Sequence, residues 1–297
     1  MTPRTDTNAP LPDVSSIEST FRDANDVRLH VVVAGDADDP LVVLLHGFPE
    51  FWYEWHQYIE PLVDAGYRVL VPDQRGYNRS DKPAGVRPYR ITELSGDVVD
   101  LIATEGRDAA HVIGHDWGAA VGWDLALRHP DAVDRLGIIN VPHPTVFQRT
   151  LTSNLTQLRK SWYMFFFQIP RLPERYVGRN DYAFLVTALE EARPGTFTET
   201  DFERYRRAWA EEEALTAMIN WYRALFRHGE DPPRGRVRVP TLIVWGDDDQ
   251  ALVPEMASRS LEYCDEGDIE RFPDATHWIP HEYPDRVSGL LLDHLGS

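Results

Sequence analysis

Gly114-His115-Asp116-Trp117-Gly118 is the stretch that decides the fold of this 297-residue chain. It directly follows an apolar run that ends at Ile113, and a helical pattern over Ala119–His129 follows it. A turn this tight between a strand and a helix needs glycine on both sides of its central residue, because the backbone there is crowded and strained. Asp116 is then held at the end of the strand, close to a helix N-terminus that favours negative charge. The pattern is typical of a nucleophile, although an aspartate that only caps a helix would give the same local sequence.

Short apolar runs recur along the chain on both sides of this turn, and helical patterns separate most of them. The run Leu41–Leu45 is apolar on both faces, as a buried strand of a parallel sheet requires. Strands that alternate with helices predict a mostly parallel central sheet with helices on both faces. The predicted strands are residues 27–33, 41–45, 68–71, 111–113, 136–139, 242–245 and 269–272.

The alternation stops between residues 142 and 236, where helical patterns and aromatic residues dominate. We interpret this segment as a helical cap inserted between two strands of the core. The predicted domains are a core of residues 17–141 and 237–297, a cap of residues 142–236, and a mobile tail of residues 1–16, which is rich in Pro, Thr, Asp and Asn.

Composition limits the partners and the compartment. A formal net charge of −18 argues against nucleic-acid partners and disfavours anionic membrane surfaces. No stretch approaches the roughly 20 apolar residues of a membrane span, so we expect no membrane insertion. The single cysteine, Cys264, cannot form an intramolecular disulfide, which is consistent with the cytoplasm. Only two of the 30 basic residues are lysines, which favours either a high-salt cytoplasm or a high-GC genome; oligomeric state stays open.

Two further loops follow strands in the order nucleophile, acid, histidine. Asp247-Asp248-Asp249 follows the strand at 242–245, and His277 follows the strand at 269–272. Each feature alone has an ordinary reading as an acidic turn or a loop histidine, but the three placements together favour a catalytic triad. His277 and His281 are four residues apart, yet Pro280 interrupts the helix that would align them, so we predict no metal site.

Four segments resemble the epoxide hydrolases of the α/β-hydrolase superfamily and, more distantly, the haloalkane dehalogenases. They are HGFPEFWYEW (46–55), PDQRGYNRSDKP (72–83), GHDWG (114–118) and ATHW (275–278), and the likeness extends from about residue 17 to the end. It implies an α/β-hydrolase fold with Asp116 as nucleophile, His277 as base and Asp249 as the acid that orients it.

The resemblance also assigns the surroundings of the nucleophile. The backbone N–H groups of Phe48 and Trp117 would form the oxyanion hole, and both residues would line the substrate pocket with Pro49. The loop from Asp73 to Pro83 is expected to be structural, and its Asp73 and Arg75 could form a supporting ion pair.

Two cap tyrosines complete what the resemblance implies. Tyr163 and Tyr222 would hydrogen-bond to the oxygen of an epoxide as its ring opens, although plain core packing is the ordinary reading for both. The implied activity converts a small apolar epoxide and water into a vicinal diol through an alkyl ester on Asp116, without a metal or an organic cofactor.

Two alternative functions remain open from the sequence. A haloalkane or haloacid dehalogenase would use the same aspartate nucleophile, but its leaving halide would not need the proton that paired tyrosines supply. A non-catalytic ligand-binding protein on the same scaffold would need no triad. A serine esterase is disfavoured because aspartate occupies the place of the serine.

Overall fold

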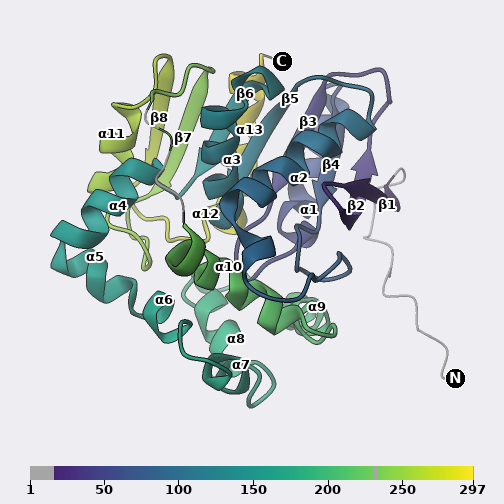
Figure 1. Ribbon diagram of the computed structural model, residues 1–297. Helices are drawn as coiled ribbons and strands as arrows, with labels where there is room; N and C mark the ends of the chain where they lie inside the picture. The colour runs from purple at the N-terminus through teal and green to yellow at the C-terminus, as the bar shows by residue number, and fades with distance from the viewer. Residues whose placement is uncertain (1–16, 230–232, 234, 297) are drawn as a thin grey trace, which may run out of the picture.

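The computed structural model describes residues 17–229, 233 and 235–296, so the tail predicted at residues 1–16 lies outside the described residues. The strands are β1 (Glu18–Ala24), β2 (Val27–Ala34), β3 (Leu41–Leu45), β4 (Arg68–Pro72), β5 (Ala110–His115), β6 (Val133–Ile139), β7 (Thr241–Gly246) and β8 (Gly267–Phe272). They form one eight-stranded sheet in the order β1-β2-β4-β3-β5-β6-β7-β8 (Figure 1). β2 pairs antiparallel with β1 and β4, and the remaining pairs are parallel.

Each predicted strand is confirmed, from β2 to β8. β1 was not predicted, because it is a polar edge strand in which exposed and half-buried residues replace an apolar run. At the centre of the sheet, every residue of β3 is buried. This burial explains why β3 and β7 lack the polar alternation of a strand with one face in water.

Helices cover both faces of the sheet, as the alternating pattern predicts. α2 (Ile91–Thr104), α3 (Trp117–Arg128) and α11 (Glu255–Leu261) contribute to one apolar core. α1 (His56–Asp64), α12 (Ile279–Glu282) and α13 (Pro284–Leu295) contribute to the other. The short 3₁₀ helices are η1 (Trp52–Trp55), η2 (Arg87–Tyr89) and η3 (Pro130–Ala132).

A helical insertion separates β6 from β7 and forms the cap, which lies below the sheet in Figure 1. Its helices are α4 (Pro144–Ser153), α5 (Leu155–Lys160), α6 (Trp162–Phe166), α7 (Leu172–Val177), α8 (Ala183–Leu189), α9 (Glu199–Trp209) and α10 (Ala214–His228). Buried indole N–H groups fasten the cap to core loops: Trp209 donates to the carbonyl of Pro49 over 2.6 Å, and Trp221 donates to that of Arg75 over 3.0 Å. The cap therefore closes over the loops at the carboxyl ends of the parallel strands.

None of the helices in the described part of the chain is long and apolar enough to cross a membrane.

Candidate active site

The turn between β5 and α3 holds Asp116 in a strained conformation. Its φ is 48° and its ψ is −121°, a region that non-glycine residues rarely occupy. Both flanking positions must be glycine, because neighbouring backbone atoms leave no room for a Cβ atom. A Cβ atom on Gly114 would lie 2.4 Å from the carbonyl carbon of Gly118, and one on Gly118 would lie 2.0 Å from the carbonyl oxygen of Leu45. The strain fixes the Asp116 carboxylate where β5 ends and α3 begins.

One oxygen of this carboxylate occupies the expected oxyanion position. The N–H of Phe48, in the loop after β3, donates to Oδ1 of Asp116 over 2.7 Å. Trp117, the second predicted donor, is the first residue of α3, and an N–H at that position has no acceptor within its own helix. The structure thus shows the Phe48 N–H bound to the Asp116 carboxylate, while the role of the Trp117 N–H stays a prediction.

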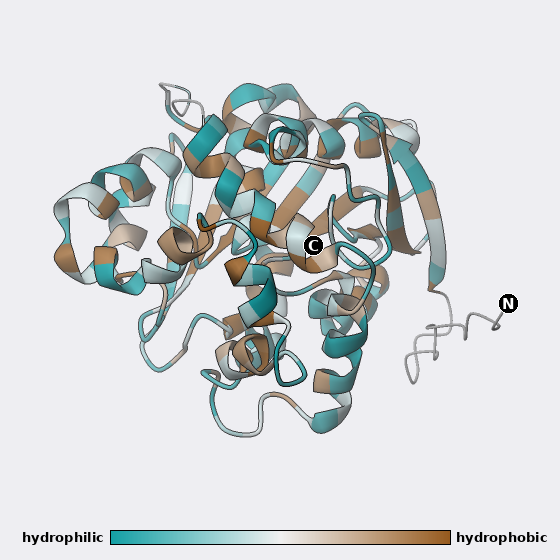
Figure 2. Cartoon of the chain, turned by 60° about the horizontal axis from the view of Figure 1, so that its bottom comes forward, coloured by the Kyte–Doolittle hydropathy of each residue, from teal (hydrophilic) through white to brown (hydrophobic). Residues whose placement is uncertain are grey.

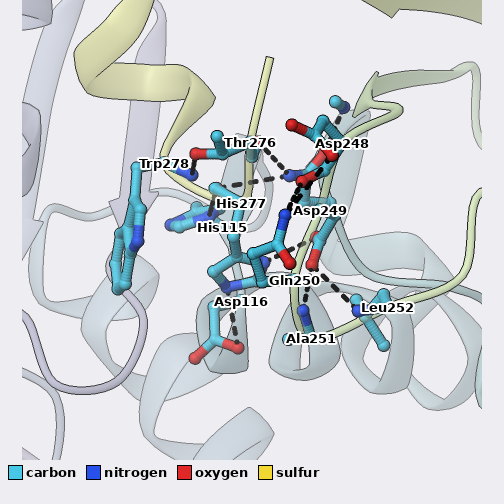
Figure 3. Close-up of polar contacts among 12 residues, drawn as sticks. His115, Asp116, Asp248, Asp249, Gln250, Ala251, Leu252, Thr276, His277 and Trp278 are labelled. Carbon is cyan, nitrogen blue, oxygen red and sulfur yellow. Dashed lines mark hydrogen bonds and ion pairs between the residues drawn. The ribbon is translucent and has the colours of Figure 1, made fainter. Parts of the chain in front are cut away.

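The three predicted triad residues come together from three loops. Nε2 of His277 lies 3.4 Å from Oδ2 of Asp116, and Nδ1 of His277 lies 2.7 Å from Oδ2 of Asp249 (Figure 3). The other oxygen of Asp249 accepts the N–H groups of Ala251 and Leu252 over 2.6 and 2.8 Å. Asp249 is buried, whereas Asp248 is exposed, so the geometry selects the last aspartate of the run.

The pKa values of Asp116 and His277 depend on each other. Burial alone would raise the pKa of Asp116, but the hydrogen bond and positive charge of His277 hold it below the ordinary value. Burial alone would lower the pKa of His277, yet Asp249 and Asp116 together raise it well above the ordinary value. The contacts between His277 and Asp116 therefore favour a protonated imidazole beside a charged nucleophile candidate.

Tyr163 of α6 and Tyr222 of α10 lie side by side in the cap, with ring centroids 5.7 Å apart. The ring of Tyr222 also packs edge-on against Trp117 at 5.1 Å and Phe48 at 5.2 Å, directly beside the nucleophile. Burial, with a contribution from the Asp116 charge, raises the pKa of both tyrosines above the ordinary value. Their hydroxyls therefore stay protonated and able to donate at neutral pH.

Two cavities meet at these residues. One has a volume of about 570 Å³ and includes Phe48, Pro49 and His277 in its lining. The other has a volume of about 400 Å³, and Trp117 lines it. Asp116, Tyr163 and Tyr222 line both, so a molecule seated between the cavities would meet the Asp116 carboxylate and both hydroxyls.

The sequence pattern of the family described as alpha/beta hydrolase fold matches residues 40–284. The chain belongs to this family. Its relatives place this α/β-hydrolase close to the epoxide hydrolases. It is 37% identical to epoxide hydrolase 1 of Caenorhabditis elegans over 94% of this chain and 70% of that protein. It is 44% identical to the AB hydrolase superfamily protein YfhM of Bacillus subtilis, over 95% of this chain and 99% of that one.

A solved structure gives the same relationship. The Bacillus megaterium epoxide hydrolase in complex with an inhibitor superposes on this α/β-hydrolase with a TM-score of 0.86 at 30% identity, covering 94% of this chain and all of that one. A variant of the same enzyme was solved with its product, (R)-3-[1]naphthyloxy-propane-1,2-diol, and superposes with a TM-score of 0.86 at 29% identity over the same shares of the two chains. The predicted α/β-hydrolase fold is confirmed.

Asn140, directly after β6, supports the loop that carries His277 and was not predicted as a site residue. It is fully buried with a φ of 51°, and its side chain joins three loops. Its amide nitrogen donates to the carbonyls of Thr276 and His277 over 3.0 and 3.2 Å, and its oxygen accepts the N–H of Gly246 over 2.6 Å. The sequence reveals only that no carboxylate stands here; the three contacts depend on tertiary structure.

A buried network of carboxylates and histidines lies behind the triad. Nε2 of His115 contacts the carbonyl of His277 at 2.9 Å, and Nδ1 of His115 lies 2.6 Å from Glu54. Glu50 lies 2.7 Å from His281 and also accepts the hydroxyl of Tyr205 from the cap. Burial opposes charge on both, but mutual attraction lowers the pKa of Glu50 and raises that of His281.

The same network contains the group of described side chains with metal-like spacing, Glu50, Glu54 and His115, whose ligand atoms all lie within 4.8 Å of one another. Glu54 and Glu50 are already matched by imidazoles at 2.6 and 2.7 Å. Each of these carboxylates therefore already has a partner within the network, and we assign the network a structural role.

The suggested ion pair between Asp73 and Arg75 is wrong. Asp73 instead lies 2.6 Å from His30 of β2, and Arg75 pairs with Asp97 of α2. A turn begins between the two residues, closed by the hydrogen bond that the N–H of Tyr77 donates to the carbonyl of Gln74 over 2.9 Å, so their side chains leave the loop in different directions. Both pairs are buried and fix the loop from Asp73 to Pro83 to the core, which fits the structural role expected of that loop.

Proposed function

We propose that this α/β-hydrolase is an epoxide hydrolase that converts an epoxide into a vicinal diol through a covalent ester on Asp116. The observation that carries the proposal is the pair Tyr163 and Tyr222, which line the same two cavities as the Asp116 carboxylate. An epoxide oxygen needs a proton when its ring opens, and two protonated phenols beside the nucleophile supply hydrogen bonds and that proton. The relationship to epoxide hydrolases supports the same chemistry.

In the first half-reaction, the geometry favours Oδ2 of Asp116 as the attacking atom, because Oδ1 is held by the N–H of Phe48. Oδ2 forms a bond to one ring carbon while the bond from that carbon to the epoxide oxygen breaks. Tyr163 and Tyr222 hydrogen-bond to the oxygen, and one of them transfers its proton to it. The product of this step is a hydroxyalkyl ester of Asp116.

In the second half-reaction, neutral His277 removes a proton from water, and the resulting hydroxide attacks the carbonyl carbon of the ester. The negative charge develops on Oδ1, where the N–H groups of Phe48 and Trp117 stabilise it. The bond between the carbonyl carbon and the alkoxide oxygen then breaks, the alkoxide takes the proton that the attacking water left on the Asp116 carboxyl group, and the diol leaves. Asp249 keeps Nδ1 of His277 protonated and the ring aligned.

Ester formation itself prepares His277 to act as a base. The Asp116 charge is one of the causes that hold the pKa of His277 high. Alkylation removes this charge, so the pKa of His277 falls and the imidazolium can give its proton to the tyrosinate that ring opening leaves behind. The nucleophile and the base are thus activated in sequence rather than together.

Within this proposal, both predicted domains supply reacting groups. The core, residues 17–141 and 237–297, supplies Asp116, Asp249 and His277, and the cap, residues 142–236, supplies the tyrosines. The aromatic lining by Phe48, Trp117 and Trp162 suits a small apolar epoxide with water as the second reactant.

A side-by-side panel of epoxides and chloro- or bromoalkanes tests the proposal. We expect diol from epoxides such as styrene oxide, with at most minor halide release, and no activity for Asp116→Asn. Halide release without diol would assign a dehalogenase instead. Tight binding of epoxides without turnover would assign a ligand-binding protein.

A further inference from the structure

The exposed large apolar side chains of the described residues all belong to the cap. Figure 2 is turned so that the cap comes forward, and it shows brown, hydrophobic segments between the teal ones along the helices of the cap. Chains of ring contacts connect them: Phe165 lies 5.3 Å from Phe226, and Phe166 lies 6.2 Å from Trp162 and 5.5 Å from Tyr176. We call this surface the cap patch. It consists of Leu155, Leu158, Trp162, Phe165, Ile169, Leu172, Tyr176, Leu225 and Phe226.

The patch has a regular origin in α5 and α6. Leu155, Leu158, Trp162 and Phe165, on α5 and α6, are spaced three or four residues apart, and Ile169 continues this spacing just after α6; the five side chains are 41–72% exposed. Normal amphipathic helices turn such a stripe inward. Here a separate set of residues on the same two helices packs against the core. The apolar stripe is therefore not needed for core packing and faces outward.

The inward stripe is Gln157, Ser161 and Met164, all buried. Gln157 holds the loop that carries Asp249: its amide nitrogen donates to the carbonyl of Ala251 over 2.9 Å, and its oxygen accepts the N–H of Val253 over 3.0 Å. The orientation of α5 and α6 is therefore fixed by the catalytic loop. The apolar stripe cannot rotate inward without breaking these contacts.

The charge of this part of the cap is opposite to that of the whole chain. Residues 140–179 contain six basic residues and one acidic residue, a net charge of +5 within a chain of −18. The one acidic residue, Glu174, is already paired with Arg223. Arg159, Arg171 and Arg175 are exposed, and in the part of the chain that the structure describes none of them has an ion-pair partner. The following segment, residues 180–213, has nine acidic and four basic residues.

We propose that the cap patch docks on the surface of an anionic lipid bilayer. Exposed aromatic and aliphatic side chains beside unpaired arginines are the composition of surfaces that lie in the headgroup region of anionic membranes. The acidic remainder of the chain is repelled by such a surface and would orient the cap toward it. The overall net charge disfavours anionic membranes, but it does not reflect the positive net charge of residues 140–179.

The patch also adjoins both cavities. Trp162 and Tyr176 line the larger one, and Leu225 and Phe226 line the smaller one. A docked cap would thus place both cavities next to the bilayer, where apolar compounds concentrate. A second copy of the chain is a poorer occupant, because a two-fold contact of this patch with itself would bring the unpaired arginines of both copies together.

The test is sedimentation of the full-length chain with vesicles of phosphatidylcholine alone or mixed with phosphatidylglycerol. We expect binding to the mixed vesicles only, and weaker binding at high salt. Leu158→Ser/Phe165→Ser and Arg171→Glu/Arg175→Glu should each bind about tenfold or more weakly. None of these four residues lines either cavity, so thermal midpoint and turnover of a small water-soluble epoxide should stay near wild type.

A charge-matched control is Arg207→Glu/Arg259→Glu, which changes two exposed arginines outside residues 140–179 and should bind like wild type. The proposal is overturned if wild type ignores the mixed vesicles, or if the patch variants bind as the control does. It is also overturned if light scattering shows a dimer that the patch variants separate into monomers, because the patch would then be a contact between copies.

Discussion

Nε2 of His277 lies 3.4 Å from Oδ2 of Asp116, while Nδ1 of the same ring lies 2.7 Å from Asp249. The histidine is thus within reach of the oxygen that we expect to become alkylated. It is also close to the carbonyl carbon that water must attack. One side chain can therefore stabilise the carboxylate before the reaction and activate water after it.

Replacing His277 with glutamine should separate the two half-reactions. His277→Gln keeps a polar side chain but has no base, so the ester on Asp116 should form and persist. Mass spectrometry should show a stable gain of one substrate mass on the peptide containing Asp116. The double variant with Asp116→Asn is the control and should gain nothing. Normal turnover by His277→Gln would remove the histidine from its assigned role.

Asp249→Asn should slow ester hydrolysis on the order of 10³-fold, because the amide neither orients His277 nor stabilises its charge. Alkylation, followed as the fast phase of single-turnover kinetics, should change much less. Asp248→Asn is the matched control, since this neighbour is exposed. Equal effects of the two substitutions would mean that the acid was assigned to the wrong residue.

The two cap tyrosines should act on ring opening alone. Tyr163→Phe and Tyr222→Phe should each slow alkylation by about 10²-fold, without slowing hydrolysis of an ester already formed. Tyr182→Phe, a cap tyrosine that lines neither cavity, is the control. A slower hydrolysis phase with unchanged alkylation would show that the tyrosines serve the second step instead.

Hydrolysis of the ester should accelerate as pH rises, because only neutral His277 can accept a proton. Asp249 is the main favourable cause of the raised pKa of His277, acting against burial. In Asp249→Asn that pKa falls, so the acid limb of the hydrolysis rate should move to lower pH even as the maximum rate drops. Stopped-flow measurements of the slow phase across pH test this, and a limb that moves upward would contradict it.

Asn140 should matter for both stability and catalysis. Asn140→Gly accepts the positive φ but leaves the N–H of Gly246 and the carbonyl of Thr276 without their partner, at a cost of about 1–3 kcal/mol. Asn140→Ala adds backbone strain and should unfold at still lower temperature. Thermal unfolding measures both, and kcat should fall more than KM rises. A glycine variant as stable as wild type would show that the side-chain contacts contribute nothing.

The parts of this protein that the sequence predicts are those encoded by local pattern. Asp116 is identifiable because its turn requires glycines at fixed positions, and β3 because burial on both faces makes its sequence continuously apolar. His277 and Asp249 follow from their places after strands. Local pattern carries no such information for β1, a polar edge strand that is recognisable only through its pairing with β2.

The remaining features depend on contacts between residues that are far apart in the sequence. Asn140 joins loops more than 100 residues away, and the pairing of Asp73 with His30 spans 43 residues. The cap patch could not be predicted from the sequence either. Its residues follow an ordinary helical spacing, and only the structure shows that the stripe faces outward because Gln157 and its neighbours face the catalytic loop.

A single turnover in water enriched in heavy oxygen tests the covalent role of Asp116 most directly. If water attacks the ester carbonyl, the first turnover must leave one heavy oxygen in the carboxylate of Asp116 and release an unlabelled diol. Digestion and mass spectrometry of the peptide containing Asp116 would show the label. Heavy oxygen found only in the diol, with Asp116 unlabelled, would mean that water attacks the epoxide directly and would contradict the account.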